Sequence, residues 1–206
     1  MQRRREVLPP SSDDHPRTIF CLAGVPAAGK STIRHQLCLR YPTNVSFLRR
    51  WTTRRVRPGE EDEVVHLKRG AFVRKTNQRL LTGIFCSNHT MYGISVEELE
   101  ALLRSGTRWI GCISASAGLS LHAIGYEVLV IYLTVRDRRV LLDRLRARGH
   151  REKEIATRMH EFDDADAEWR DVSGDCVLAT DSLSVEETVQ AVIRLLRLPT
   201  GTLLPT

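Results

Sequence analysis

The sequence predicts an α/β fold with a mainly parallel central sheet flanked by helices. Short, nearly continuous apolar runs alternate along the chain with charged or amphipathic stretches of helical length. Continuous apolar runs are typical of strands that are buried on both faces, as the strands of a parallel sheet are. The 206 residues are 42% hydrophobic and 27% charged, which is the composition of one ordinary folded domain.

The first elements are a strand, a glycine-containing loop and a helix. Thr18–Ala23 is apolar and is bounded by Gly24, so we expect a buried central strand. Ser31–Arg40 has helical spacing of apolar residues and ends before Pro42. The pattern then becomes irregular, and its short apolar runs predict a small β-rich insertion at about residues 49–95.

The second half of the chain returns to alternating strands and helices. Strands are predicted at Trp109–Ile113, Val128–Val135 and Val177–Ala179, and helices at Val96–Arg104, Arg138–Ala147, Glu152–Trp169 and Val185–Leu198. We expect one folded domain over residues 18–198, with tails at 1–17 and 199–206 that have no periodic apolar pattern.

The loop between the first strand and helix carries the clearest motif. It satisfies G-x-x-x-x-G-K-[ST] with the residues Gly24, Val25, Pro26, Ala27, Ala28, Gly29, Lys30, Ser31 and Thr32. Backbone N–H groups of such a loop cradle nucleotide phosphates, the lysine reaches the β- and γ-phosphates, and the hydroxyl after it holds Mg²⁺. The motif predicts a P-loop NTPase fold. No N-K-x-D motif follows, which argues against a GTPase switch protein.

An arginine-rich loop follows this helix, and it resembles a known family. Two guanidinium groups three residues apart can bind one phosphate bidentately, and neighbouring threonines add hydroxyl groups. The segment is similar to the T-T-R-x-x-R-x-G-E segment of the guanylate kinase family, and it reads Thr52-Thr53-Arg54-Arg55-Val56-Arg57-Pro58-Gly59-Glu60.

The resemblance extends over most of residues 18–198. Tyr92-Gly93 looks like a second acceptor-phosphate contact, and the arginines of 144–149 with Arg158 are similar to the family's lid, here about residues 143–160. The resemblance implies ATP and Mg²⁺ as substrate and cofactor. It also implies that Arg54, Arg57 and Tyr92 hold the acceptor phosphate, and that Lys30, Arg144, Arg148 and Arg158 are catalytic.

Several positions depart from the family pattern. Arg50 stands in place of a serine, and His66 in place of a tyrosine that binds the acceptor phosphate. Where the family has an acidic end to its middle strand, this chain has Ile110-Gly111-Cys112-Ile113-Ser114. The Leu80–Cys86 run has no clear glutamate to bind the N–H groups of a base. Phosphate binding is therefore expected to be retained while base recognition is rewritten. We predict an acceptor site made of Arg50, Thr53, Arg54, Arg57, His66 and Tyr92.

Four functions are considered. The leading one is an ATP-dependent kinase of a phosphorylated small molecule, with a nucleoside monophosphate such as GMP as the best candidate. A kinase of a phosphorylated sugar or of a specialised metabolite is the alternative. The run from Arg50 to Arg54 and the run Tyr92-Gly93-Ile94 resemble ribose 1,5-bisphosphate phosphokinase. A non-catalytic guanylate-kinase-like binding module is a third. The net charge of +6 suggests nucleic-acid binding as a fourth function, which is the weakest of the four.

Location and assembly are predicted from composition. No apolar run of about 18 residues is present, and the basic N-terminus is followed by prolines, serines and aspartates, so we expect a cytoplasmic protein without a membrane partner. The five cysteines have no paired spacing and are expected to be free thiols. A monomer or homodimer is expected.

Overall fold

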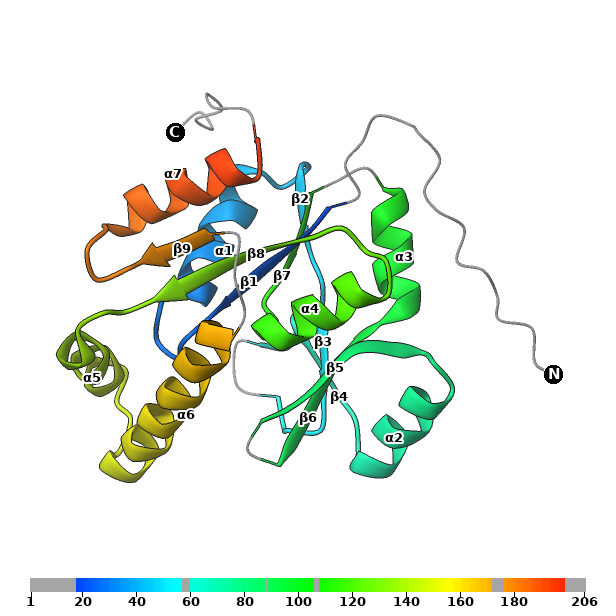
Figure 1. Cartoon of the computed structure of the whole chain (residues 1–206), viewed down its shortest axis with the longest axis horizontal. Coiled ribbons are helices and arrows are strands. Elements are labelled where there is room, and N and C mark those ends of the chain that lie inside the picture. Colours follow the sequence, from blue (N-terminus) through cyan, green and yellow to red (C-terminus); the bar gives the residue numbers. More distant parts are fainter. Residues whose placement is uncertain (1–17, 57–59, 88, 106–107, 172–175, 199–206) are drawn as a thin grey trace.

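A five-stranded parallel sheet forms the centre of the molecule (Figure 1). The computed structural model describes residues 18–56, 60–87, 89–105, 108–171 and 176–198. The strand order across the sheet is β2-β7-β1-β8-β9. These strands are β2 (Val45–Phe47), β7 (Arg108–Gly111), β1 (Ile19–Gly24), β8 (Val128–Thr134) and β9 (Cys176–Ala179).

The central position of β1 follows from its composition. Residues 19–23 are buried on both faces, and β1 pairs in parallel with β7 on one side and with β8 on the other. An unbroken apolar run suits a strand with covered faces, whereas an edge strand facing water would alternate. β1 therefore ends at the middle of the sheet's carboxyl edge, which is where parallel α/β sheets carry their ligand sites.

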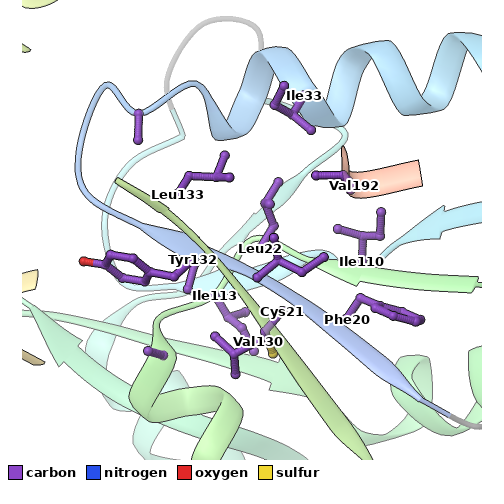
Figure 2. Close-up of a cluster of buried hydrophobic side chains, with 14 of the residues drawn as sticks. Phe20, Cys21, Leu22, Ile33, Ile110, Ile113, Val130, Tyr132, Leu133 and Val192 are labelled. Atoms are coloured by element: carbon purple, nitrogen blue, oxygen red, sulfur yellow. The ribbon is translucent and has the colours of Figure 1, made fainter. Parts of the chain in front are cut away.

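Helices cover both faces of this sheet. Figure 2 shows Leu22 and Leu133 on the side of α1 (Lys30–Arg40) and α7 (Val185–Leu195), with Ile33 and Val192 projecting from these helices. The other face is covered by α4 (Ala115–Ala123). Gly118 lets α4 approach closely, because a Cβ there would lie only 3.0 Å from the Cys21 sulfur.

A second, four-stranded sheet is built from residues 50–95. Its order is β4-β3-β6-β5, and it consists of β3 (Arg50–Thr52), β4 (Val64–His66), β5 (Leu81–Ser87) and β6 (Thr90–Ser95). The helix α2 (Arg69–Asn77) lies against this sheet through the fully buried Phe72. α4 contacts both β8 and β5, so it joins the two sheets.

Three further helices complete the fold. α3 (Val96–Arg104) follows β6 directly and is capped by the Ser95 hydroxyl, which accepts from the Glu98 N–H. α5 (Arg138–Ala147) and α6 (Glu152–Asp171) form a pair beyond the carboxyl end of β8 (Figure 1). Within the described ranges, no helix is long and apolar enough to cross a membrane.

The predicted fold class is confirmed, but the sequence interpretation missed several elements. Two helices, α2 and α4, and three strands, β2, β3 and β6, were not predicted individually. α2 has only one fully buried side chain, Phe72, so its apolar pattern is weak. α4 is rich in alanine, serine and glycine and has no polar face for a periodicity to detect. The tails at 1–17 and 199–206 lie outside the described residues.

Candidate active site

The loop between β1 and α1 depends on two glycines. At Gly24, φ is +134° and a Cβ would lie 2.0 Å from the carbonyl oxygen of Leu133, so only glycine allows β1 to approach β8 there. Gly29 is the N-cap of α1 with a left-handed φ of +94°. The loop thus delivers the N-terminus of α1, with its unpaired N–H groups, to the carboxyl edge of the central sheet.

Lys30 is folded over this loop. Its Nζ donates to the carbonyl oxygens of Gly24 at 2.7 Å and Val25 at 2.8 Å. Burial, together with smaller effects of the nearby positive charges of Arg50, Arg148 and Arg158, lowers the pKa of Lys30 to about 8. A cation that is buried beside other cations favours an anion in their midst, because the anion relieves their mutual repulsion.

These cations border a cleft of about 640 Å³ between the two sheets and the helix pair α5–α6. The loop before α1 and its first turn contribute five lining residues, and the remainder come from the second sheet and its loop, the β7–α4 junction, β8 and the helix pair. The lining residues are Gly24, Pro26, Ala27, Lys30, Ser31, Arg50, Arg54, Glu60, Phe85, Cys86, Ser87, Tyr92, Cys112, Ile113, Ser114, Ala115, Ser116, Tyr132, Leu145, Arg148, His150, Arg158 and Glu161.

The other residues of the predicted phosphate loop support it from behind. Val25 and Ala28 are fully buried, and the Val25 N–H donates to the Leu133 carbonyl at 3.2 Å. Thr32 is exposed on α1 and does not line the cleft. Lys30 and Ser31 therefore line the cleft, while Val25 and Ala28 pack into the core.

Arg50 and Arg54 form the second-sheet side of the cleft together with acidic partners. Arg54 Nη2 donates to Glu60 Oε2 at 2.5 Å. Arg50 Nη2 lies 4.0 Å from Glu60 Oε1 and 3.9 Å from Glu63 Oε2. These carboxylates hold the two guanidinium groups at the cleft without an anionic ligand, and an incoming phosphate would compete for them.

Tyr92 lies on β6 opposite Phe85 of β5, and both side chains line the cleft. Their ring centroids are 4.8 Å apart and their planes differ by 11°, so they are stacked. Directly opposed residues of antiparallel strands project to the same face, which accounts for the pairing.

The helix pair contributes Arg148 and Arg158. Arg158 Nη1 donates to Glu161 Oε2 at 2.6 Å, one turn along α6. Arg148 is the exposed C-cap residue of α5 and lines the cleft. Two arginines that are ten positions apart in the chain therefore face the phosphate loop from the same side.

Among the described residues predicted to bind the acceptor or to be catalytic, Thr53, His66 and Arg144 do not line the cleft. The Thr53 hydroxyl accepts from the Met91 N–H at 3.0 Å and so joins β3 to β6. His66 is exposed, and its Nδ1 contacts the Arg54 carbonyl oxygen at 2.8 Å. Arg144 donates to the Thr180 hydroxyl and carbonyl at 2.9 and 2.7 Å and to the Ala27 carbonyl at 3.3 Å. Arg57 lies outside the described residues, and the ligand-binding roles of all four stay predictions.

The cleft also contains residues that the sequence analysis did not assign to the site. Glu161 stands three residues after Arg158 in a predicted helix, so this pair was detectable by its spacing. Glu60 stands at the end of the arginine-loop motif, six residues after Arg54, and its pairing with Arg54 was not detectable in this way. Phe85, Cys86 and Cys112 have no local signal of this kind. They reach the cleft only because β5 and β7 end beside it.

The oxygen atoms that the cleft offers fit Mg²⁺ that is also coordinated by a bound nucleotide. Within the described ranges, no cluster of three or more histidine, cysteine, aspartate or glutamate side chains can hold a metal ion by itself. Ser31 lies at the cleft directly after Lys30 and supplies one hydroxyl oxygen. Mg²⁺ commonly takes one or two protein oxygens and completes its shell with phosphate oxygens and water.

Relatives found by sequence comparison are guanylate kinases. The chain is 31% identical over 141 residues to guanylate kinase 1 of Arabidopsis thaliana, covering 67% of this chain and 36% of the relative. It is 31% identical over 127 residues to guanylate kinase of Chlorobium chlorochromatii, covering 59% and 65%. Guanylate kinase 1 of Oryza sativa is 30% identical over 144 residues, covering 67% and 37%. The chain spans less than two thirds of the length of each of these relatives.

Structural and family comparisons agree with these relatives. The fold is similar to the crystal structure of guanylate kinase from Anaplasma phagocytophilum, with a TM-score of 0.66, 18% identity, and coverage of 87% of this chain and 84% of that one. The family model described as guanylate kinase matches residues 16–198, which include every strand and helix of the two sheets and the helix pair. The chain therefore belongs to the guanylate kinase family.

Proposed function

We propose that this protein transfers the γ-phosphoryl group of ATP to a nucleoside monophosphate such as GMP. One observation carries the proposal: a single cleft holds Lys30 of the phosphate loop, arginines of the second sheet, and arginines of the helix pair. Phosphoryl transfer between two phosphates needs little covalent chemistry but needs cations arranged around a highly charged, in-line transition state. Family membership and the names of the relatives support the same reaction.

The proposed role of each cationic side chain follows from its position in the cleft. Lys30 and the N–H groups at the start of α1 bind the β- and γ-phosphates of ATP. Arg50 and Arg54 bind the phosphate of the acceptor on the opposite side of the cleft. Arg148 and Arg158 stabilise the charge on the transferring group from the helix pair. Glu60 and Glu161 keep the arginines positioned until phosphates replace them.

Mg²⁺ is part of the proposal as the partner of ATP. When bound, it would offset negative charge on the β- and γ-phosphate oxygens. The Ser31 hydroxyl is the protein oxygen that would hold it.

The test is ATP-to-ADP turnover with Mg²⁺ and a panel of acceptors: GMP, dGMP, AMP, UMP, CMP and ribose 1,5-bisphosphate. We expect turnover with nucleoside monophosphates and none in Lys30→Ala. Turnover with ribose 1,5-bisphosphate alone would replace the proposed acceptor with a phosphorylated sugar. ATP binding without turnover of any acceptor would contradict the proposed reaction.

A matched pair of arginine variants tests the acceptor side. Arg54 lines the cleft, whereas its neighbour Arg55 is exposed and does not. We expect Arg54→Ala to raise the KM of the acceptor by roughly 10-fold to 150-fold, since a charge-assisted hydrogen bond contributes about 1.5–3 kcal/mol. Arg55→Ala should leave this KM unchanged. Equal effects of both substitutions would show that Arg54 does not contact the acceptor.

A further inference from the structure

We propose that the acceptor site tolerates different bases: it holds a nucleoside monophosphate by its phosphate and by stacking, without selecting guanine through its N–H donors. The inference rests on the proposed function and concerns the side of the same cleft that faces the acceptor. Two independent features carry it: the state of the carboxylates that line the cleft, and the conformation of β5.

The carboxylates in the described lining are Glu60 and Glu161, and both are bonded to arginines. Glu60 is held 2.5 Å from Arg54 and Glu161 is held 2.6 Å from Arg158. Each lies among the cations that serve the phosphates. We therefore infer that neither carboxylate accepts hydrogen bonds from the N–H groups of a base.

Apart from His150 and the cationic side chains of lysine and arginine, the other polar side chains of the described lining carry hydroxyl or thiol groups. Ser87, Ser114 and Cys86 offer hydroxyl or thiol groups, which both donate and accept hydrogen bonds. The Ser114 hydroxyl already accepts from the Ala117 N–H at 3.1 Å and lies 3.0 Å from the Ser116 hydroxyl. Guanine presents N–H donors where adenine does not, and an ionised carboxylate, which only accepts, would distinguish them. A hydroxyl can turn to suit either base.

β5 is irregular at the point where it enters the cleft. Its register with β6 shifts between Thr82 and Phe85. Gly83 within this bulge has a left-handed φ of +55°, and a Cβ there would face the core, 3.3 Å from Ile94 Cδ1 and 3.6 Å from Leu121 Cγ. Thr82, Gly83 and Ile84 are not among the residues that line the cleft, so the bulge offers the cleft no side chain.

The next residue of β5 that lines the cleft is aromatic. Phe85 stacks on Tyr92 with a centroid separation of 4.8 Å, and both line the cleft. Every base has a π-face, so stacking on aromatic side chains holds bases with little regard to their identity. β5 and β6 therefore provide a base-tolerant aromatic surface beside the arginines that bind phosphate.

The first experiment measures both turnover and affinity for GMP, IMP and AMP. IMP differs from GMP only in lacking the 2-amino group, so this pair isolates recognition of that donor. We expect kcat/KM values, and dissociation constants from calorimetry, within about tenfold of one another, because no polar group of the site is left unpaired by the change. A GMP preference over IMP of about 100-fold or more in either measurement would overturn the inference.

Measuring both turnover and affinity allows the inference of base tolerance and the proposed kinase reaction to fail independently. Equal dissociation constants without turnover would support base tolerance while contradicting the kinase reaction. Turnover with strong selection for GMP would support the reaction and overturn base tolerance.

Phe85→Ala tests the stacking surface. We expect it to weaken binding of GMP, IMP and AMP by a common factor of roughly tenfold, and to leave binding of ribose 5-phosphate, which has no base, unchanged. Phe85→Tyr keeps the aromatic ring, so it should weaken binding of the three nucleotides less than Phe85→Ala does. Equal loss of ribose 5-phosphate binding in Phe85→Ala, or unchanged binding of all three nucleotides, would overturn the role of the stacked pair.

Discussion

At the scale of single residues, the arginines of the helix pair differ in what they contact. Arg158 and Arg148 line the cleft and are close enough to Lys30 to lower its pKa. Arg144 instead bonds to Thr180 and to the phosphate-loop carbonyl of Ala27. Charge alone therefore does not identify which arginine serves the reaction, and the geometry favours Arg148 and Arg158.

Arg158→Ala is expected to lower kcat by about 100-fold to 1,000-fold, with a smaller effect on the KM of ATP. Removing a group that stabilises the charge of the transition state typically costs a factor of this size. Steady-state kinetics at saturating ATP and acceptor measure it. Arg151→Ala is the matched control, because Arg151 is exposed just before α6 and does not line the cleft. Equal losses in the two variants would point to damage to the helix pair.

At the scale of elements, the N-terminal turn of α7 is held by a capping box and by an ion pair with α1. Ser184 and Glu187 form a capping box at its N-terminus. Glu186 accepts from both terminal nitrogens of Arg40 on α1, at 2.9 and 2.6 Å. These hydrogen bonds, with a further one from Gln190, lower the pKa of Glu186 to about 2.

The Arg40–Glu186 pair predicts a pH-dependent stability difference. Because the pKa of Glu186 is lowered from 4.5 to about 2 on folding, the stabilisation is fully present above pH 4.5 and is lost as the pH falls toward 2. Glu186→Gln should therefore unfold at a lower urea concentration than the parent at pH 7, and the two midpoints should converge near pH 2. A double variant with Arg40→Gln should be no less stable than Glu186→Gln. A difference that persists into acid would contradict the ion pair as its source.

At the scale of the whole molecule, the cleft is assembled from segments far apart in the sequence. The loop before α1, residues of the second sheet and the α5–α6 pair meet there, and α4 joins the two sheets beneath it. A ligand that contacts all of these segments binds the folded state only, so it stabilises the entire fold by mass action.

ATP with Mg²⁺ is therefore expected to raise the thermal midpoint of the parent protein. At a concentration 100 times its dissociation constant, the gain is about 2.7 kcal/mol, which corresponds to roughly 5–10 °C for a chain of this size. Lys30→Ala should lose most of this shift in differential scanning fluorimetry. Lys153→Ala, at an exposed lysine of α6 outside the cleft lining, should retain it. The same shift in both variants would exclude Lys30 from ATP binding.

Features encoded by neighbouring residues were predictable from the sequence. The strand at Ile19–Gly24, the phosphate loop and α1 follow from one apolar run and one motif, because their geometry depends on local backbone requirements. Arg54 and Tyr92 were also found by motif, and both line the cleft. The predicted domain boundaries, cytoplasmic location and monomeric or homodimeric state stay predictions.

Other features depend on contacts between distant segments. Thr53 and Arg54 are adjacent in one motif, yet the Thr53 hydroxyl joins β3 to β6 while the Arg54 side chain lines the cleft. The stacking of Phe85 on Tyr92 depends on the register of two strands and on the bulge at Gly83. The sequence by itself determined the fold class and the phosphate-binding loop, because both rest on periodicity and local backbone geometry. Only the tertiary structure decided which arginines meet and what surrounds the acceptor, because strand register and helix packing set those distances.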